Sequence, residues 1–218
     1  MGANTFNVQS TTPSRFAAGG ERAQVGTPDG AVYTASYWDY LAFQGREYHA
    51  GPSASGTVVT GQTSLATTTP TLLLRVLDGT VAIPSRLHLA QAGTIAGGAI
   101  SVLIEADNAD RWSSGGTAAT VLPARTDNPL TQGSTLYTGA TAADGYGVQL
   151  WGALLGEDVS PAEGSLAGAI RLSLREGTLP LSYLRGPASY LIFTYAATTG
   201  PSWHWGFSWF EVPKADLP

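Results

Sequence analysis

The stretch SWHWGFSWFEVP, from Ser202 to Pro213, decides the fold class of this chain. At the two-residue period of a strand, one face of the stretch carries four large aromatic rings: Trp203, Trp205, Phe207 and Trp209. The other face carries the smaller residues His204, Gly206 and Ser208. On a helix the same rings would spread around the cylinder. We therefore expect a strand whose rings form the core; an exposed aromatic platform for a sugar or a partner subunit is the alternative.

Composition limits the classes of function that the chain can have. Only 12% of its 218 residues are charged, with 11 basic and 16 acidic side chains. No basic patch indicates nucleic-acid binding, and sparse charge is typical of a surface that neighbouring subunits cover. The chain has no cysteine, which excludes a disulfide framework and a thiol nucleophile.

No segment of the sequence predicts a leader or a membrane span. Polar residues follow Met1, without the basic start and apolar run of a leader. No later run approaches the roughly 20 apolar residues that cross a bilayer. We expect a protein that is made in a cytoplasm, used as encoded and not in contact with a membrane.

The N-terminal part of the chain differs in pattern from the rest. Residues 1–30 are rich in Gly, Thr and Pro and have no sustained period, as in an arm or linker. In residues 31–50, one face of a short helix could carry Tyr37, Trp38, Tyr40 and Leu41, but Tyr33 and Tyr48 fit an extended path equally well. Either way, the many aromatic residues indicate a segment that packs on a neighbouring surface. We expect an arm at residues 1–50 and a single domain at residues 51–218.

From Gly56 onward, short apolar runs alternate with turn signals. The runs predict strands at residues 57–60, 71–77, 81–83, 86–90, 96–106, 117–122, 145–156, 170–174 and 189–196, ahead of the aromatic strand. Asp78-Gly79 predicts a tight turn, and we expect a hairpin of the strands on either side of it. The last two strands are expected to form a terminal hairpin, and the long apolar run 145–156 to lie inside a sheet.

This pattern predicts an all-β fold. Short strands, irregular loops and no fixed repeat favour a β-sandwich over a propeller or a solenoid. Long central loops, and a C-terminal strand whose rings need cover, favour a jelly roll with an extended N-terminal arm. An immunoglobulin-like sandwich and an arm-supported barrel are the alternatives.

The search for catalytic or metal-binding motifs gives little. The three histidines, His49, His88 and His204, are not at metal-ligand spacing, so structural roles are expected. No Gly-x-Ser-x-Gly run is present. The acidic run 105–110 could surround a calcium ion, but it lacks EF-hand spacing and a solvated turn is favoured. The carboxylates Glu157, Asp158 and Glu163 fit a solvated loop. We expect no catalytic residue, no metal and no cofactor.

Three runs resemble jelly-roll structural proteins of tailed bacteriophages, particularly those that infect cyanobacteria. They are YLAFQGREYHAG at 40–51, the run from DGTVAIPSRLHLAQAG to TVLPARTDN at 78–128, and FSWFEVP at 207–213. The resemblance implies a virion protein, in that family often a capsid cement or decoration protein that sits as a trimer on the major capsid protein shell. It implies no catalytic residues. The aromatic-rich ending departs from the family, which leaves open whether that strand forms core or subunit contacts.

Three hypotheses from different classes follow. The first is a structural protein of the virion capsid surface, whose partners are the major capsid protein and, as a homotrimer, itself. The second is a phage receptor-binding module whose exposed rings stack on sugars. The third is a polysaccharide-cleaving enzyme with paired carboxylates.

Overall fold

The computed structural model describes residues 36–52, 54, 56–92, 99–127, 130–157, 169–197 and 199–216, and the backbone of two short paired strands, β1 (Phe6–Asn7) and β2 (Glu21–Arg22). The rest of the predicted arm at residues 1–30, and the carboxylates Asp158 and Glu163, lie outside the described residues. The helices of the described part are too short to traverse a lipid bilayer.

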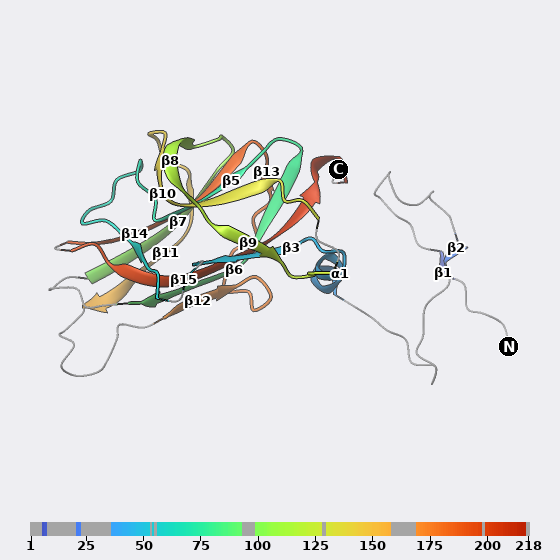
Figure 1. The fold of residues 1–218 in the computed structure, drawn as a ribbon, viewed down its shortest axis with the longest axis horizontal. Coiled ribbons are helices and arrows are strands. Elements are labelled where there is room, and N and C mark those ends of the chain that lie inside the picture. The colour runs from blue at the N-terminus through green and yellow to red at the C-terminus, as the bar shows by residue number, and fades with distance from the viewer. Residues whose placement is uncertain are drawn as a thin grey trace.

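Two antiparallel sheets form the body, an all-β sandwich as the sequence predicts (Figure 1). The order of the six-stranded sheet is β11 (Val148–Glu157), β7 (Ala99–Asp107), β14 (Ala188–Ala196), β5 (Leu72–Val76), β10 (Ser134–Ala142), β8 (Trp112–Ala118). The order of the seven-stranded sheet is β12 (Ile170–Ser173), β6 (Thr80–Gln91), β15 (Ser202–Pro213), β3 (Glu47–Gly51), β9 (Thr120–Pro123). Two short strands complete it: β13 (Leu184–Arg185) pairs with β6, and β4 (Val59–Thr60) with β15. The jelly-roll connectivity within this sandwich stays a prediction.

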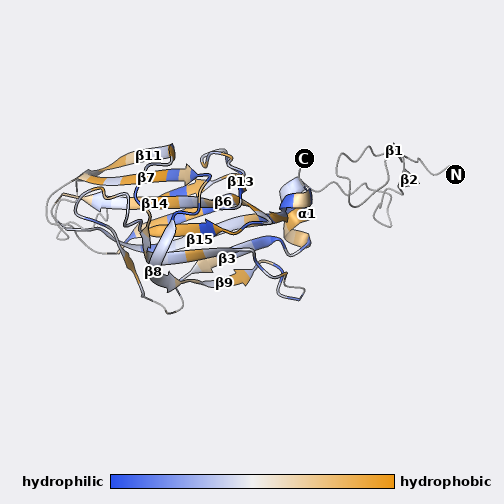
Figure 2. Ribbon diagram, turned by 90° about the horizontal axis from the view of Figure 1, so that it is seen from above, coloured by the Kyte–Doolittle hydropathy of each residue, from blue (hydrophilic) through white to orange (hydrophobic). Residues whose placement is uncertain are grey.

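The aromatic strand β15 lies between β6 and β3 and supplies the centre of the core. Trp203, Trp205, Phe207 and Trp209 are at most 6% exposed, so they are core residues and not a sugar platform. Phe207 also meets Tyr190 of the opposite sheet at 5.8 Å between ring centroids. Hydrophobic residues recur along the strands of both sheets because each sheet turns one face toward the other (Figure 2).

Both predicted hairpins are wrong. The chain does turn at Asp78-Gly79, where the Thr80 amide donates to the Leu77 carbonyl. However, β5 pairs with β14 and β10, whereas β6 pairs with strands of the other sheet. In the same way β14 and β15 lie in different sheets. A tight turn fixes the reversal of the chain but not the hydrogen-bonding partner, and here the apolar faces of consecutive strands meet across the core.

Two further expectations about strands are corrected. The run 145–156 was expected inside a sheet, but β11 lies at the end of the six-stranded sheet and pairs with β7 alone. Its apolar residues are therefore not all covered. The predicted strand 117–122 is divided between β8 and β9, and residues 112–116, for which no strand was expected, belong to β8, because pairing with β10 satisfies the backbone of this Gly- and Ser-rich segment.

The start of the folded body lies earlier than residue 51. Helix α1 (Tyr37–Phe43) is capped by Ser36, whose Oγ accepts a hydrogen bond from the Asp39 amide. Its buried Leu41 packs on the outer face of the seven-stranded sheet, in a cluster with Val81, Ile83, Phe210 and Val212. Because β3 pairs with β15, residues 37–51 belong to the domain. Helix α1 and the C-terminus lie at the same end of the sandwich (Figure 1).

Candidate functional site

The most exposed apolar residues of the sheets lie along the edge strand β11. Val148 is 70% exposed, Leu154 is 71% exposed, and Tyr146, just before the strand, is 78% exposed. Natural edge strands are commonly protected by charges or proline, which prevent pairing with other chains. From Val148 to Gly156, β11 has neither a charged residue nor a proline. We call Tyr146, Val148 and Leu154 the β11 surface. The register with β7 shifts after Gln149, so Val148 and Leu154 lie on opposite faces of this edge. Exposed apolar side chains on an edge without charge or proline are typical of an interaction site.

A groove of about 620 Å³ opens at one end of the β11 surface. Tyr146 and Val148 line it together with Tyr183, which is 53% exposed. Polar atoms also line the groove, among them those of Asn108 and Ser182. A groove that combines exposed rings with a few polar groups can hold a sugar or a partner side chain.

Buried charged residues fix the wall of the groove that carries Tyr146. Arg111 is buried; its guanidinium donates to the carbonyls of Ala143 and Gly145 and pairs with Asp107 at 3.1 Å. The buried Glu105 accepts a hydrogen bond from the Gly147 amide at 3.2 Å. These contacts hold the turn before β11 from two sides, so Tyr146 projects from a fixed backbone.

Residue 147 is a glycine because of a close backbone contact. A Cβ at this position would lie 2.6 Å from the carbonyl oxygen of Ala106. The opposite wall carries Tyr183, whose neighbour in the sequence is Leu184 of β13. Leu184 is buried and pairs with Ala82 of β6, so it anchors this wall. Both tyrosines of the groove are thus carried by segments that are packed or hydrogen-bonded to the sandwich.

Carboxylates of the acidic run 105–110 form ion pairs with arginine side chains. Asp110 pairs with Arg75, whose Nε donates to Oδ2 at 2.8 Å, and this hydrogen bond is the main cause that raises the pKa of Arg75. The Arg75 guanidinium also lies over the ring of Trp112, 4.7 Å from its centroid. Within the described residues, no group of three His, Asp or Glu side chains could hold a metal ion. The run therefore joins strands through ion pairs, which the sequence did not predict, while its bend at Asn108 and Ala109 is exposed, as expected of a solvated turn.

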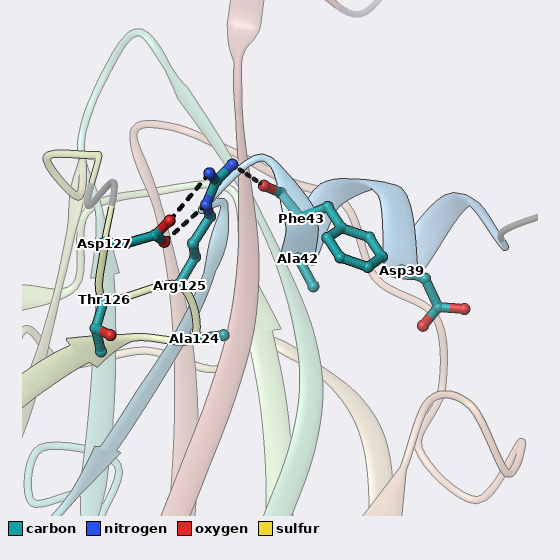
Figure 3. Close-up of a pocket in the computed structure, with 7 residues that line it drawn as sticks. All are labelled: Asp39, Ala42, Phe43, Ala124, Arg125, Thr126 and Asp127. Atoms are coloured by element: carbon teal, nitrogen blue, oxygen red, sulfur yellow. Dashed lines mark hydrogen bonds and ion pairs between the residues drawn. The ribbon is translucent and has the colours of Figure 1, made fainter. Parts of the chain in front are cut away.

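A second hollow, of about 750 Å³, lies between α1 and residues 124–127 (Figure 3). The Arg125 guanidinium donates to Asp127 at 2.8 Å and to the carbonyl of Phe43 at 2.7 Å, whereas Asp39 points away from it. Ser36 and Arg175 bind the Asp39 carboxylate and lower its pKa. The charged groups around this hollow already have partners within the chain. Their contacts, above all the hydrogen bond from Arg125 to Phe43, attach α1 to the sandwich.

The aromatic residues predicted near the N-terminus divide between surface and core. Tyr37 is 51% and Tyr40 is 45% exposed, so both lie on the outer side of α1. Trp38 faces inward and stacks on Phe210, with 5.2 Å between ring centroids. The structure does not bring these residues together with the β11 surface, which the sequence reasoning missed. The absence of charge from Val148 to Gly156 was visible in the sequence, but a central strand would show the same pattern.

Comparison with protein-family models, with curated proteins and with solved structures finds no match for this chain.

Proposed function

We propose that the chain is a structural protein of a tailed-bacteriophage particle, a capsid cement or decoration protein that binds the major capsid protein and assembles as a homotrimer. The observation that carries the proposal is the edge strand β11, which has no charge or proline from Val148 to Gly156 and on which Val148 and Leu154 are each at least 70% exposed. A long apolar edge invites pairing with other chains, and closed assembly removes that liability. The resemblance of three runs to phage jelly-roll proteins supports the virion as the place of assembly.

The sparse charge of the chain agrees with this proposal. Charged residues make up 12% of the sequence, and the described basic groups mostly pair with acids of the same chain. Few charges are then left to repel or exclude a neighbouring protein surface, and cores of protein interfaces are likewise depleted of charge. The β11 surface is the part of the sandwich that a neighbouring subunit would cover.

The test combines localisation with an edge variant. Val148→Lys together with Leu154→Lys places two charges on β11, while both side chains are exposed and the core is untouched. Leu122→Lys is the matched control, because Leu122 is 62% exposed on β9, at the edge of the other sheet. Light scattering after size exclusion should show a trimer for the wild type and the control.

The double variant should either dissociate or lose attachment to particles that lack the protein, and cryo-electron microscopy should place the wild type on the icosahedral shell. A wild-type protein that is monomeric and absent from the shell would contradict the proposal. An edge variant that assembles and attaches like the wild type would show that β11 is not the contact surface.

The groove beside β11 favours a second candidate, a carbohydrate-binding module of a tail or fibre. Tyr146 and Tyr183 line the same groove with exposed rings, and rings stack on the apolar faces of sugars. Tyr146→Ala and Tyr183→Ala should then abolish binding to host polysaccharide and leave the oligomer intact. Particle images with the protein at the tail would support this candidate over the first.

A further inference from the structure

Arg86 and Arg171 differ from the other described cationic side chains because they have no partner within the described part of the chain. Six others form ion pairs with carboxylates: Arg46, Arg75, Arg111, Arg125, Arg175 and Lys214. Arg185 also has a partner. In a chain with 16 acidic and only 11 basic residues, two unpaired guanidiniums need a physical explanation.

The two arginines lie on neighbouring strands and point to the same side. In the register of β12 with β6, Arg171 lies opposite His88, and Arg86 lies opposite Ser173. The alternate residues Leu87 and Leu172 are buried in the core, so the arginines are on the outer face of the sheet. Arg86 and Arg171 are therefore diagonal neighbours, about 7–8 Å apart at the backbone, a separation that two long side chains can bridge.

Small residues of β15 leave this part of the face open. Gly206 lies opposite His88 and Ser208 lies opposite Arg86. A Cβ built on Gly206 meets no atom within 4 Å. Helix α1 covers the other end of this face, around Phe210. The result is a hollow of about 400 Å³ lined by Arg86, His88, Arg171, Ser173 and Glu176, among others.

We propose that Arg86, Arg171 and His88 bind an oxyanion of the phosphate or sulfate class in this hollow. Like charges at diagonal positions repel one another, and an anion held between them removes the repulsion. Guanidinium groups match the oxygens of phosphate and sulfate with paired N–H donors, and a histidine ring N–H or a serine hydroxyl adds another donor. Glu176 is the acidic side chain that lines the hollow, and its single negative charge is outnumbered by the two positive charges of Arg86 and Arg171. This site is on a different sheet from β11 and does not depend on the proposed function.

The test is a titration of the full chain with inorganic sulfate and inorganic phosphate, followed by NMR of the backbone amides and arginine side chains at constant ionic strength. Saturable shifts should centre on residues 86–88 and 171–173. Arg86→Gln and Arg171→Gln should each weaken binding, which raises the dissociation constant at least tenfold. Arg175→Gln is the matched control, because Arg175 follows the same strand but pairs with Asp39, and it should bind like the wild type.

A second pair of variants separates charge from bulk. Gly206→Glu places a carboxylate in the open space beside His88 and should abolish binding, whereas Gly206→Gln has nearly the same size and should retain most of it. A sulfated monosaccharide and its unsulfated form tell a sugar-borne group from the free ion, since tighter binding of the sulfated sugar than of sulfate would identify the former. Shifts that do not saturate, or that survive in Arg86→Gln and Arg171→Gln alike, would overturn the proposal.

Discussion

The indole nitrogen of Trp209 donates a hydrogen bond of 2.7 Å to Oε1 of Glu211, two residues along the same strand and buried with it. The other carboxylate oxygen of Glu211 accepts a hydrogen bond from the Gly133 amide at 2.6 Å. One acidic side chain thus satisfies a buried indole and ties β15 to the segment before β10. A buried carboxylate is tolerated here because it is hydrogen-bonded on both oxygens.

Replacement of Glu211 should therefore be costly in proportion to the donors that it leaves unpaired. Glu211→Ala removes both acceptors, and each orphaned donor costs about 1–3 kcal/mol, so we expect a loss of about 2–6 kcal/mol in the free energy of unfolding. Glu211→Gln keeps one acceptor oxygen and leaves one donor unpaired, so about half of that loss is expected. Urea denaturation measures both, and equal losses for the two variants would show that the hydrogen bonds are not the source.

The rings of β15 should dominate core stability. Trp205→Ala removes a ring that is 6% exposed and leaves a cavity, at an expected cost of about 3–5 kcal/mol. Tyr146→Ala is the control, because Tyr146 is 78% exposed and its truncation should change stability by less than about 0.5 kcal/mol. A Trp205→Ala protein that unfolds at the wild-type urea concentration would contradict the core assignment.

Helix α1 offers a matched pair that tests whether it belongs to the folded body. Leu41 is buried against Ile83 and Phe210, and Leu41→Ala should cost about 2–5 kcal/mol. Phe43, two positions later, is 62% exposed, so Phe43→Ala should be nearly neutral. Thermal unfolding separates the outcomes; a neutral Leu41→Ala would return α1 to the arm.

The sequence indicated the sandwich and its central strand because both depend on the period of the side chains. Alternation from Trp203 to Trp209 determines which residues are buried, whatever the pairing. The pairing of the strands was not predictable from the sequence. The turn at Asp78-Gly79 led us to expect a hairpin, but the two strands that flank it lie in different sheets. The two candidate sites could not be predicted for the same reason. The edge position of β11 and the proximity of Arg86 to Arg171 both depend on the order of the strands in the sheets.

Two buried tyrosine hydroxyls make a further matched comparison. Tyr48 donates a hydrogen bond to the carbonyl of Leu130 at 3.1 Å, whereas the hydroxyl of Tyr190 has no hydrogen-bond partner among the described residues. Tyr48→Phe should therefore destabilise by about 1 kcal/mol. Tyr190→Phe removes an unpaired polar atom and should leave stability unchanged or slightly raised. A larger loss for Tyr190→Phe than for Tyr48→Phe in urea denaturation would contradict this assignment.

Alkaline pH should unfold the protein through the same tyrosines. Burial, with a smaller contribution from the Glu211 carboxylate, raises the pKa of Tyr48 to about 12, and burial also raises the pKa of Tyr190. In the unfolded chain a tyrosine loses its proton near pH 10. The folded state then binds more protons than the unfolded state between about pH 10 and pH 12, so the stabilisation is complete below that window and is lost as the pH rises through it. Each tyrosine contributes a slope of up to about 1.4 kcal/mol per pH unit. Urea unfolding at pH 9, 10, 11 and 12 should show a steeper decline for the wild type than for Tyr48→Phe or Tyr190→Phe, and parallel declines for all three proteins would mean that neither hydroxyl is the titrating group.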